Sequence, residues 1–214
     1  MKTIVELLGP PAAGKTTLAG VLNGGMSVVP EQLRALLLEP DPPPPGEERQ
    51  AAVARRIAAE VAASPEGTVL VDVGWLSLIS FACAEWPVER ARRVADAVVD
   101  AARAAGECRY AGLVVLDAGD EELRGRAAAD APTGRRRGAL EDNLARFHRE
   151  DALLRTAEAF LPPGTVLRPH QSDVDGRAAE VRSWLARGGA GVDPSSLLRR
   201  VAGLWTRVTD TSTR

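Results

Sequence analysis

The stretch that decides the fold is GPPAAGKT, which runs from Gly9 to Thr16. It fits the pattern G-x-x-x-x-G-K-[ST] at every position, between a short apolar run, Thr3–Leu8, and a run that favours a helix, Gly14–Leu22. A glycine-rich turn between a strand and a helix points backbone N–H groups at one centre, where the helix dipole adds positive potential. The sequence therefore predicts a phosphate-binding loop that opens an α/β domain.

The fixed positions of this loop have chemical roles in holding a nucleotide. Lys15 offers a compact positive charge that can reach the outer phosphates, and the Thr16 hydroxyl can bind Mg²⁺. Lysine occurs only as Lys2 and Lys15, whereas arginine fills every other basic position, which indicates that arginine would not serve in the loop. We expect ATP and Mg²⁺ as cofactors, and the expected nucleotide-binding residues are Gly9, Pro10, Ala12, Ala13, Gly14, Lys15, Thr16 and Thr17.

Strand-like and helix-like runs alternate along the chain. We expect strands at Thr3–Leu8, Met26–Val29, Thr68–Val73, Gly112–Leu116 and Thr165–Leu167. Helices are expected over Gly14–Leu22, around Arg34–Leu38, and over Glu48–Ala63, Trp75–Ala84, Val88–Ala105, Asp120–Ala129, Ala139–Phe160, Val174–Arg187 and Pro194–Val208. This alternation predicts an α/β fold with a five-stranded parallel sheet, strand order 2-3-1-4-5, sandwiched by helices and carrying a lid.

The length of 214 residues and the hydrophobic content of 45% fit one core. The expected organisation is a domain over residues 1–188, with a lid at about 124–140. A C-terminal helix and tail over 189–214 would pack on that domain or on a partner. The proline-dense run EPDPPPPGEE at Glu39–Glu48 is expected to be extended on the surface.

Charge and cysteine content exclude several classes of protein. The net charge of −2 gives no overall basic field for nucleic acid and no polybasic segment for a membrane surface. Cys83 and Cys108 form no disulfide framework, and neither a signal peptide nor a membrane span is recognisable. We therefore expect a cytoplasmic protein whose partners are ATP and a small molecule, with neither nucleic acid nor membrane among them.

A second acidic element supports the phosphate-binding loop. Val69–Asp72 is an apolar strand that ends in an aspartate, which places an acid near the metal of a bound nucleotide. We expect Thr16 and Asp72 to be the metal ligands. A solvated aspartate at a strand end is the alternative. The sequence Asp72-Val73-Gly74-Trp75 breaks the DxxG spacing of a GTPase, and no NKxD sequence follows, which argues against a signalling GTPase.

The other candidate residues follow the second and third strands or bracket the lid. The expected catalytic residues are Lys15, Asp72, Glu31, Arg126 and Arg136, and the expected substrate-binding residues are Glu31, Arg34 and Trp75. Each has an alternative: Glu31 as a solvated residue at a helix start, Trp75 as a core residue, and the lid arginines as a plain surface or a nucleic-acid patch.

Several segments together resemble the nucleoside and nucleotide kinases with a P-loop. The loop itself is followed by VVPEQLR at Val28–Arg34, by Gln50 in a helix and by VLVDVGWLSLISFA at Val69–Ala82. The segment Pro30–Arg34 is similar to one in ribosylnicotinamide-kinase-like proteins, and deoxynucleoside and thymidylate kinases also carry an acid there.

The resemblance covers nearly all of Thr3–Leu185 and implies a lid near Leu113–Arg126 and Arg135–Glu150, with an adenine loop within Val166–Leu185. This sequence departs from the family pattern at Asp72-Val73, where family members often carry an arginine directly after the acid. The resemblance implies an ATP-dependent kinase that phosphorylates a nucleoside, a nucleotide or a similar acceptor, and a homodimer through Trp75–Ala105 would be compatible with it. The alternative is a regulatory or accessory NTPase that hydrolyses ATP slowly without a small-molecule acceptor.

Overall fold

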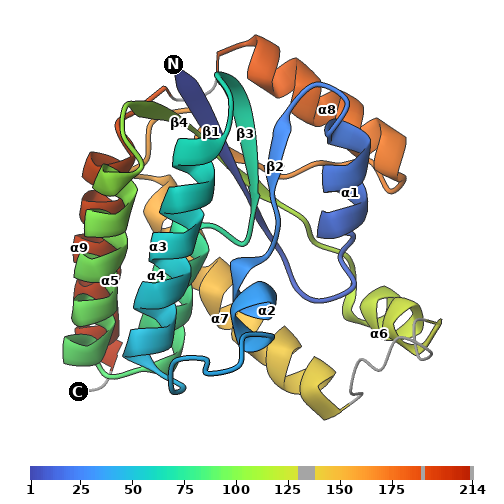
Figure 1. Cartoon of the computed structure of the whole chain (residues 1–214). Coiled ribbons are helices and arrows are strands. Elements are labelled where there is room, and N and C mark those ends of the chain that lie inside the picture. The colour runs from blue at the N-terminus through green and yellow to red at the C-terminus, as the bar shows by residue number, and fades with distance from the viewer. Residues whose placement is uncertain (130–137, 189–190, 213–214) are drawn as a thin grey trace.

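The computed structural model describes residues 1–129, 138–188 and 191–212, without the side chains of residues 34, 138, 139 and 209–212. Its centre is a five-stranded parallel sheet in the order β2-β3-β1-β4-β5, as predicted (Figure 1). The strands are β1 (Lys2–Leu8), β2 (Ser27–Val29), β3 (Gly67–Asp72), β4 (Cys108–Val115) and β5 (Val166–Leu167). Leu7 pairs with Asp72, so the ends of β1 and β3 lie side by side.

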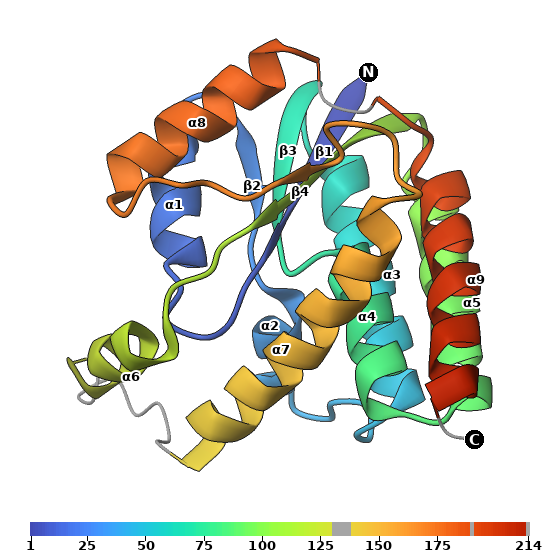
Figure 2. The same cartoon turned by 180° about the vertical axis from the view of Figure 1, so that it is seen from behind.

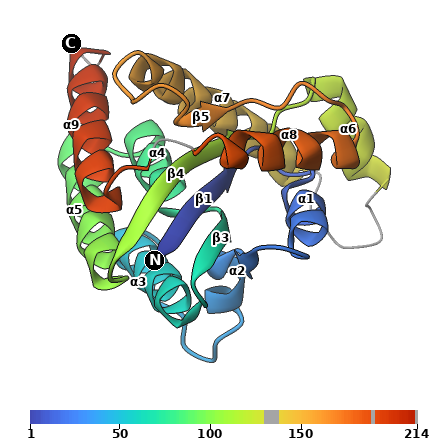
Figure 3. The ribbon, with the colours of Figure 1, turned by 90° about the horizontal axis from the view of Figure 1, so that it is seen from above.

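Helices cover both faces of the sheet, and Figure 3 shows the sheet edge-on between them. Their bounds are α1 (Lys15–Leu22), α2 (Gln32–Leu37), α3 (Glu47–Ala63), α4 (Trp75–Glu85), α5 (Val88–Ala104), α6 (Asp120–Ala129), α7 (Gly138–Glu158), α8 (Val174–Ala186) and α9 (Pro194–Ser212). Alternate side chains of β1 serve two cores. Ile4 and Leu8 pack with α3, α4, α5 and α9, while Val5 and Leu7 pack with α1 and α8.

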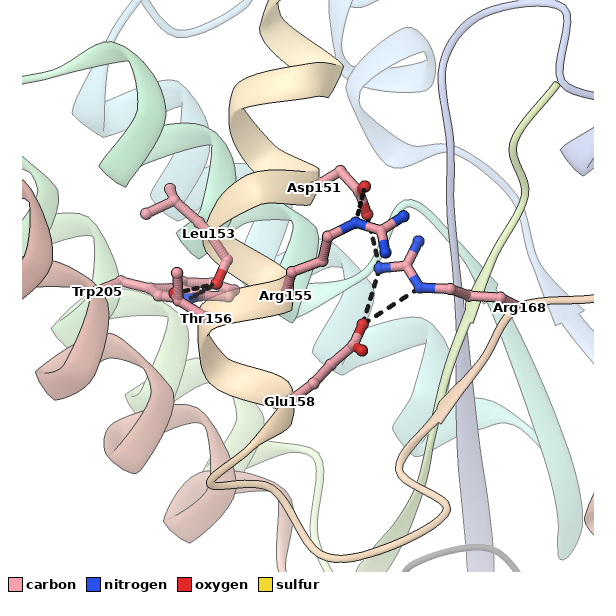
Figure 4. A network of polar contacts seen from close by, with 7 residues as sticks. All are labelled: Asp151, Leu153, Arg155, Thr156, Glu158, Arg168 and Trp205. Carbon is pink, nitrogen blue, oxygen red and sulfur yellow. Dashed lines mark hydrogen bonds and ion pairs between the residues drawn. The ribbon is translucent and has the colours of Figure 1, made fainter. Parts of the chain in front are cut away.

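The C-terminal helix α9 lies along α5 on one flank of the domain (Figure 2). Its Trp205 side chain is fully buried, and the indole N–H donates to the backbone oxygen of Leu153 in α7, at 2.7 Å. Figure 4 shows this contact beside a second one, in which the Arg168 guanidinium binds Asp151 at 2.7 Å and Glu158 at 2.8 Å. These two contacts fix α7 between α9 and the end of β5.

Two element boundaries differ from the predictions by four residues, and the other boundaries differ by two residues or fewer. β4 begins at Cys108 instead of Gly112, because its first residues pair with β1 and the Tyr110 N–H donates to Val192 at 2.7 Å. These are contacts between distant segments, which the mixed run CRYA does not reveal. Helix α9 continues to Ser212 instead of ending at Val208. Within the described residues no helix is long and apolar enough to cross a membrane.

Candidate nucleotide-binding site

A large cleft opens at the carboxyl ends of β1 and β3. Its volume is about 1310 Å³, and residues from the loop 9–16, from α2 to α7 and from the start of α8 line it. This is the edge of a parallel sheet at which ligands bind in open α/β folds. The fold therefore brings the predicted phosphate-binding loop and the predicted Asp72 to the same cavity.

The phosphate-binding loop has the backbone that its sequence predicts. Gly14 lies in the left-handed region with a φ of 93°, and Ala12 does so with a φ of 66°, which a residue with a Cβ rarely adopts. The Lys15 ammonium donates to the Gly9 oxygen at 2.8 Å and to the Pro10 oxygen at 3.1 Å. Its charge thus lies across the mouth of the loop, and the exposed side chains of Thr16 and Thr17 line the cleft beside it.

The two predicted metal ligands are neighbours. The Thr16 hydroxyl donates to Oδ2 of Asp72 at 3.3 Å, although the residues are far apart in the sequence. Asp72 is only 5% exposed, and its other oxygen, Oδ1, has no hydrogen-bond partner in the described part of the chain. Burial raises the pKa of Asp72, while the positive charge of Lys15 and the Thr16 hydroxyl partly offset this.

This pair fits a magnesium ion that is shared with a nucleotide. A hydroxyl and a carboxylate are hard oxygen ligands, and Mg²⁺ is usually held by one or two carboxylates together with substrate phosphates. No group of three or more acidic, histidine or cysteine side chains that could hold a metal occurs among the described residues. The residues present therefore suit Mg²⁺ bound with ATP better than a metal held by protein ligands alone.

The residues predicted to bind substrate fall in different places. Glu31 is exposed, precedes α2 and lines the cleft. Arg34 lies in α2, but its side chain is outside the described part. Trp75 does not suit ligand contact, because its side chain is fully buried and its indole N–H donates to the Ala54 oxygen at 3.2 Å. The alternative prediction, that Trp75 is a core residue, fits this position. Trp75 therefore does not belong to the substrate site.

The structure describes the predicted lid, residues 124–140, only at its two ends. Arg126 of α6 lines the cleft, is paired with Glu122 and donates to the Ala12 oxygen of the phosphate-binding loop at 3.4 Å. Arg124 makes a two-bond contact with Glu141, at 2.7 and 2.9 Å, which ties α6 to the start of α7. Arg136, the other predicted lid arginine, lies outside the described residues.

Arg177 and Glu150 are two of the cleft residues that were not predicted. Arg177 of α8 donates to the Ala13 oxygen at 3.1 Å and to the Gln171 oxygen at 2.8 Å, so it fixes the expected adenine loop to the phosphate-binding loop. Glu150 of α7 lines the cleft and is only 7% exposed. Burial raises the pKa of Glu150 to about 7, although Arg146 and the Ser80 hydroxyl favour its charged form. Neither residue belongs to a local motif, so sequence spacing alone could not find them.

A buried acid, Glu6, holds the turn that follows Asp72 at the cleft. Glu6 of β1 is fully buried and accepts a hydrogen bond from the Leu76 N–H, at 2.9 Å, in the first turn of α4. A Cβ on Gly74 would lie 2.3 Å from the Glu6 carboxyl carbon, so a larger residue there would have to displace the Glu6 side chain. Val73, between Gly74 and Asp72, has a φ of 60°, which is rare for a β-branched residue. Glu6 thus anchors the strained turn that follows Asp72.

Replacing Glu6 by glutamine is expected to change how stability depends on pH. Burial raises the pKa of Glu6 from 4.5 to about 8, so between these pH values the folded chain holds a proton that the unfolded chain releases. The contribution of Glu6 to stability therefore falls as the pH rises through this window. Glutamine still accepts the bond from Leu76 and never ionises. We expect Glu6→Gln to gain about 2–4 kcal/mol relative to the wild type between pH 5 and pH 8.

Chemical denaturation at the two pH values measures this gain. The control is Glu60→Gln, which changes an exposed glutamate on α3 and is expected to leave the pH dependence unaltered. Other buried acids, such as Glu150, are present in every variant and cancel in the difference. An equal pH dependence for Glu6→Gln and the wild type would show that Glu6 does not titrate in this window.

Comparisons with known proteins identify the fold. No protein-family model matches the sequence, and no curated protein does either. Among solved structures, the chain is similar to a crystal structure of the NadR protein in complex with NR, at 17% sequence identity and a TM-score of 0.60. The match covers 89% of this chain and 50% of that chain, so this chain spans about half the length of its structural neighbour. A likeness at this identity shows a shared P-loop fold.

Proposed function

We propose that this chain is an ATP-dependent small-molecule kinase, which transfers the γ-phosphate to a nucleoside, a nucleotide or a similar acceptor. The observation that carries the proposal is the extent of the cleft. It continues from the phosphate-binding loop to residues of α2, α3, α4 and α5, and its volume is about 1310 Å³. Sites for one small ligand usually occupy about 300–1,000 Å³. The cleft therefore has room for a nucleotide and a second molecule.

In this proposal each end of the cleft has its own residues. Lys15 binds the outer phosphates, and Arg177 holds the loop that faces the adenine. Thr16 and Asp72 hold Mg²⁺, which neutralises charge on the phosphates when it is bound. Arg126, which already contacts the phosphate-binding loop, and Arg136 of the lid neutralise charge that develops on the transferred group.

The transfer step needs an acceptor oxygen and a base. The acceptor oxygen forms a bond to the γ-phosphorus while the bond to the bridging oxygen of ADP breaks, and the hydroxyl proton passes to a carboxylate. Glu31 lines the cleft at the start of α2, whereas Asp72 accepts a hydrogen bond from Thr16 of the phosphate-binding loop. We therefore assign Glu31 to the acceptor hydroxyl and Asp72 to the metal. Residues 1–188 form the kinase domain in this proposal, and α9 packs on it.

The test is whether consumption of ATP depends on a small acceptor. Purified protein with Mg²⁺ and ATP is assayed for ADP with and without a pool of nucleosides, nucleoside monophosphates and amino sugars. We expect ADP formation to rise at least about tenfold with the pool, because water is a poorly positioned acceptor. Slow ADP formation that is unchanged by every acceptor would instead favour the regulatory NTPase. The likeness to a NadR structure solved with NR supports the fold of this proposal and does not name the acceptor.

A further inference from the structure

The end of the cleft that α3 and α4 line has a mixed lining. Val53, Leu78 and Phe81 supply apolar surface, and Gln50 of α3 and Ser77 of α4 supply polar groups. Phe81 packs edge-on against Trp86, with 5.3 Å between the ring centres. A wall of this kind suits a molecule with one apolar or flat face and a few polar groups.

Two polar atoms of this end have no partner within the protein. Gln50 is 8% exposed and Ser77 is 4% exposed, and in the described part of the chain neither Oε1 of Gln50 nor the Ser77 hydroxyl makes a hydrogen bond. Together with Oδ1 of Asp72 they are three of the four such side-chain atoms there, and all three residues line the cleft. A buried polar atom without a partner costs free energy, so the place of these residues in the wall of the cleft indicates that a ligand supplies bonds to Gln50 and Ser77, as a metal ion would to Asp72.

The lining of the cleft also includes acceptors of hydrogen bonds. The carboxylates of Glu31, Asp72 and Glu150 all line the cleft. Ser80 lies one turn after Ser77 on α4, and its hydroxyl donates to Glu150 at 3.1 Å, so this face of α4 is turned toward Glu150. A ligand that meets these groups gains most by donating hydrogen bonds through hydroxyl or amino groups.

The described arginines at this end are already engaged by the protein. Arg49 donates to the Pro43 oxygen at 2.8 and 3.0 Å, and Arg90 is paired with Glu47 at 3.0 Å and lies over the Trp86 ring. Arg146 is paired with Glu150 at 3.4 Å. A phosphate on the acceptor would have to share these arginines with the protein groups that they already bind, in a cleft that three carboxylates also line. The described surface therefore favours an acceptor without a phosphate.

We propose that the acceptor is an unphosphorylated molecule with hydroxyl or amino groups, neutral or positively charged, which is bound by Gln50 and Ser77 beside the Phe81 wall. This inference rests on the proposed function and narrows it. Within the proposed range of acceptors it selects the nucleoside-like and amino-alcohol-like compounds and rejects the nucleoside monophosphates.

Matched pairs of acceptors test the proposal. The protein is supplied with Mg²⁺ and ATP and with nucleosides, amino sugars and the monophosphates of both, and mass spectrometry detects each product. We expect the unphosphorylated member of a pair to be preferred by about 100-fold in kcat/KM. Preference for a monophosphate would overturn this inference and leave the proposed kinase function intact. ATP binding without a phosphorylated product from either set would instead contradict the proposed function, and this inference with it.

Two variants test the residues that bind the preferred acceptor. Ser77→Ala removes a hydroxyl that has no protein partner, so the protein is expected to lose no stability, while the KM for the acceptor rises about tenfold and the KM for ATP is unchanged. Gln50→Met is expected to act in the same way. Ser183→Ala, on the exposed face of α8, is the matched control. An unchanged KM for the acceptor in both cleft variants would remove Gln50 and Ser77 from the site.

Discussion

Replacing Lys15 by methionine is expected to lower phosphoryl transfer at least about 1,000-fold, while the protein stays folded. The Lys15 ammonium lies across the mouth of the phosphate-binding loop, at 2.8 Å from the Gly9 oxygen, where the outer phosphates of ATP are proposed to lie. Methionine keeps most of the length of the side chain and removes the charge that would stabilise the transferred group. Steady-state assays with a phosphorylated product, together with a thermal melt, measure both parts of the expectation.

The sequence offers an unusually clean control for this experiment. Lysine occurs only at positions 2 and 15, and Lys2 begins β1 at the end of the sheet opposite the cleft. Lys2→Met removes the same group and is expected to retain full activity. Lys15→Arg is expected to lose phosphoryl transfer activity as well, because a guanidinium is wider than an ammonium and cannot take its place in the loop. Activity of Lys15→Met within tenfold of the wild type would contradict the assignment of Lys15.

Replacing Trp205 by alanine is expected to destabilise the fold by about 3–5 kcal/mol. The Trp205 side chain is fully buried between α9 and the body of the domain, and its N–H donates to the Leu153 oxygen at 2.7 Å. The change removes apolar contact and leaves a cavity. Denaturant unfolding followed by circular dichroism gives the loss.

Trp205→Phe separates the two contributions to this loss. It keeps one aromatic ring and lacks the N–H together with part of the bicyclic indole, so we expect it to cost about 1–2 kcal/mol. Leu38→Ala, at a residue that is 80% exposed, is the control for a large side chain outside the core. If Trp205→Ala unfolds at the same denaturant concentration as the wild type, α9 does not contribute to the stability of the domain.

The sheet could be predicted from the sequence because its signals are local. The apolar runs of β1, β3 and β4, each followed by a helical segment, predict a parallel sheet, and the loop 9–16 identifies the edge at which ligands bind. The same local logic predicted that Thr16 and Asp72 would be neighbours, because both follow the ends of adjacent parallel strands.

The acceptor end of the cleft could not be predicted in this way. Glu150 and Ser77 come from α7 and α4, and only the packing of these helices turns both residues toward the same space. Trp75 is a residue that the sequence placed in the site and the structure does not. It follows a strand end, which suggested a ligand contact, but the first turn of α4 directs its side chain against Ala54 of α3. Glu6 lies inside an apolar strand, where its role under α4 depends on the close approach of Gly74.

Following the γ-phosphate itself shows whether the chain transfers it to an acceptor or releases it to water. ATP labelled at the γ-phosphorus is incubated with the protein, Mg²⁺ and the pool of unphosphorylated acceptors, and the label is located by chromatography and mass spectrometry. A kinase places the label on an organic acceptor in the wild type and in Lys2→Met, and we expect no such product with Lys15→Met. Label released only as inorganic phosphate, at a rate that no acceptor changes, would show that the chain is not a kinase for these acceptors.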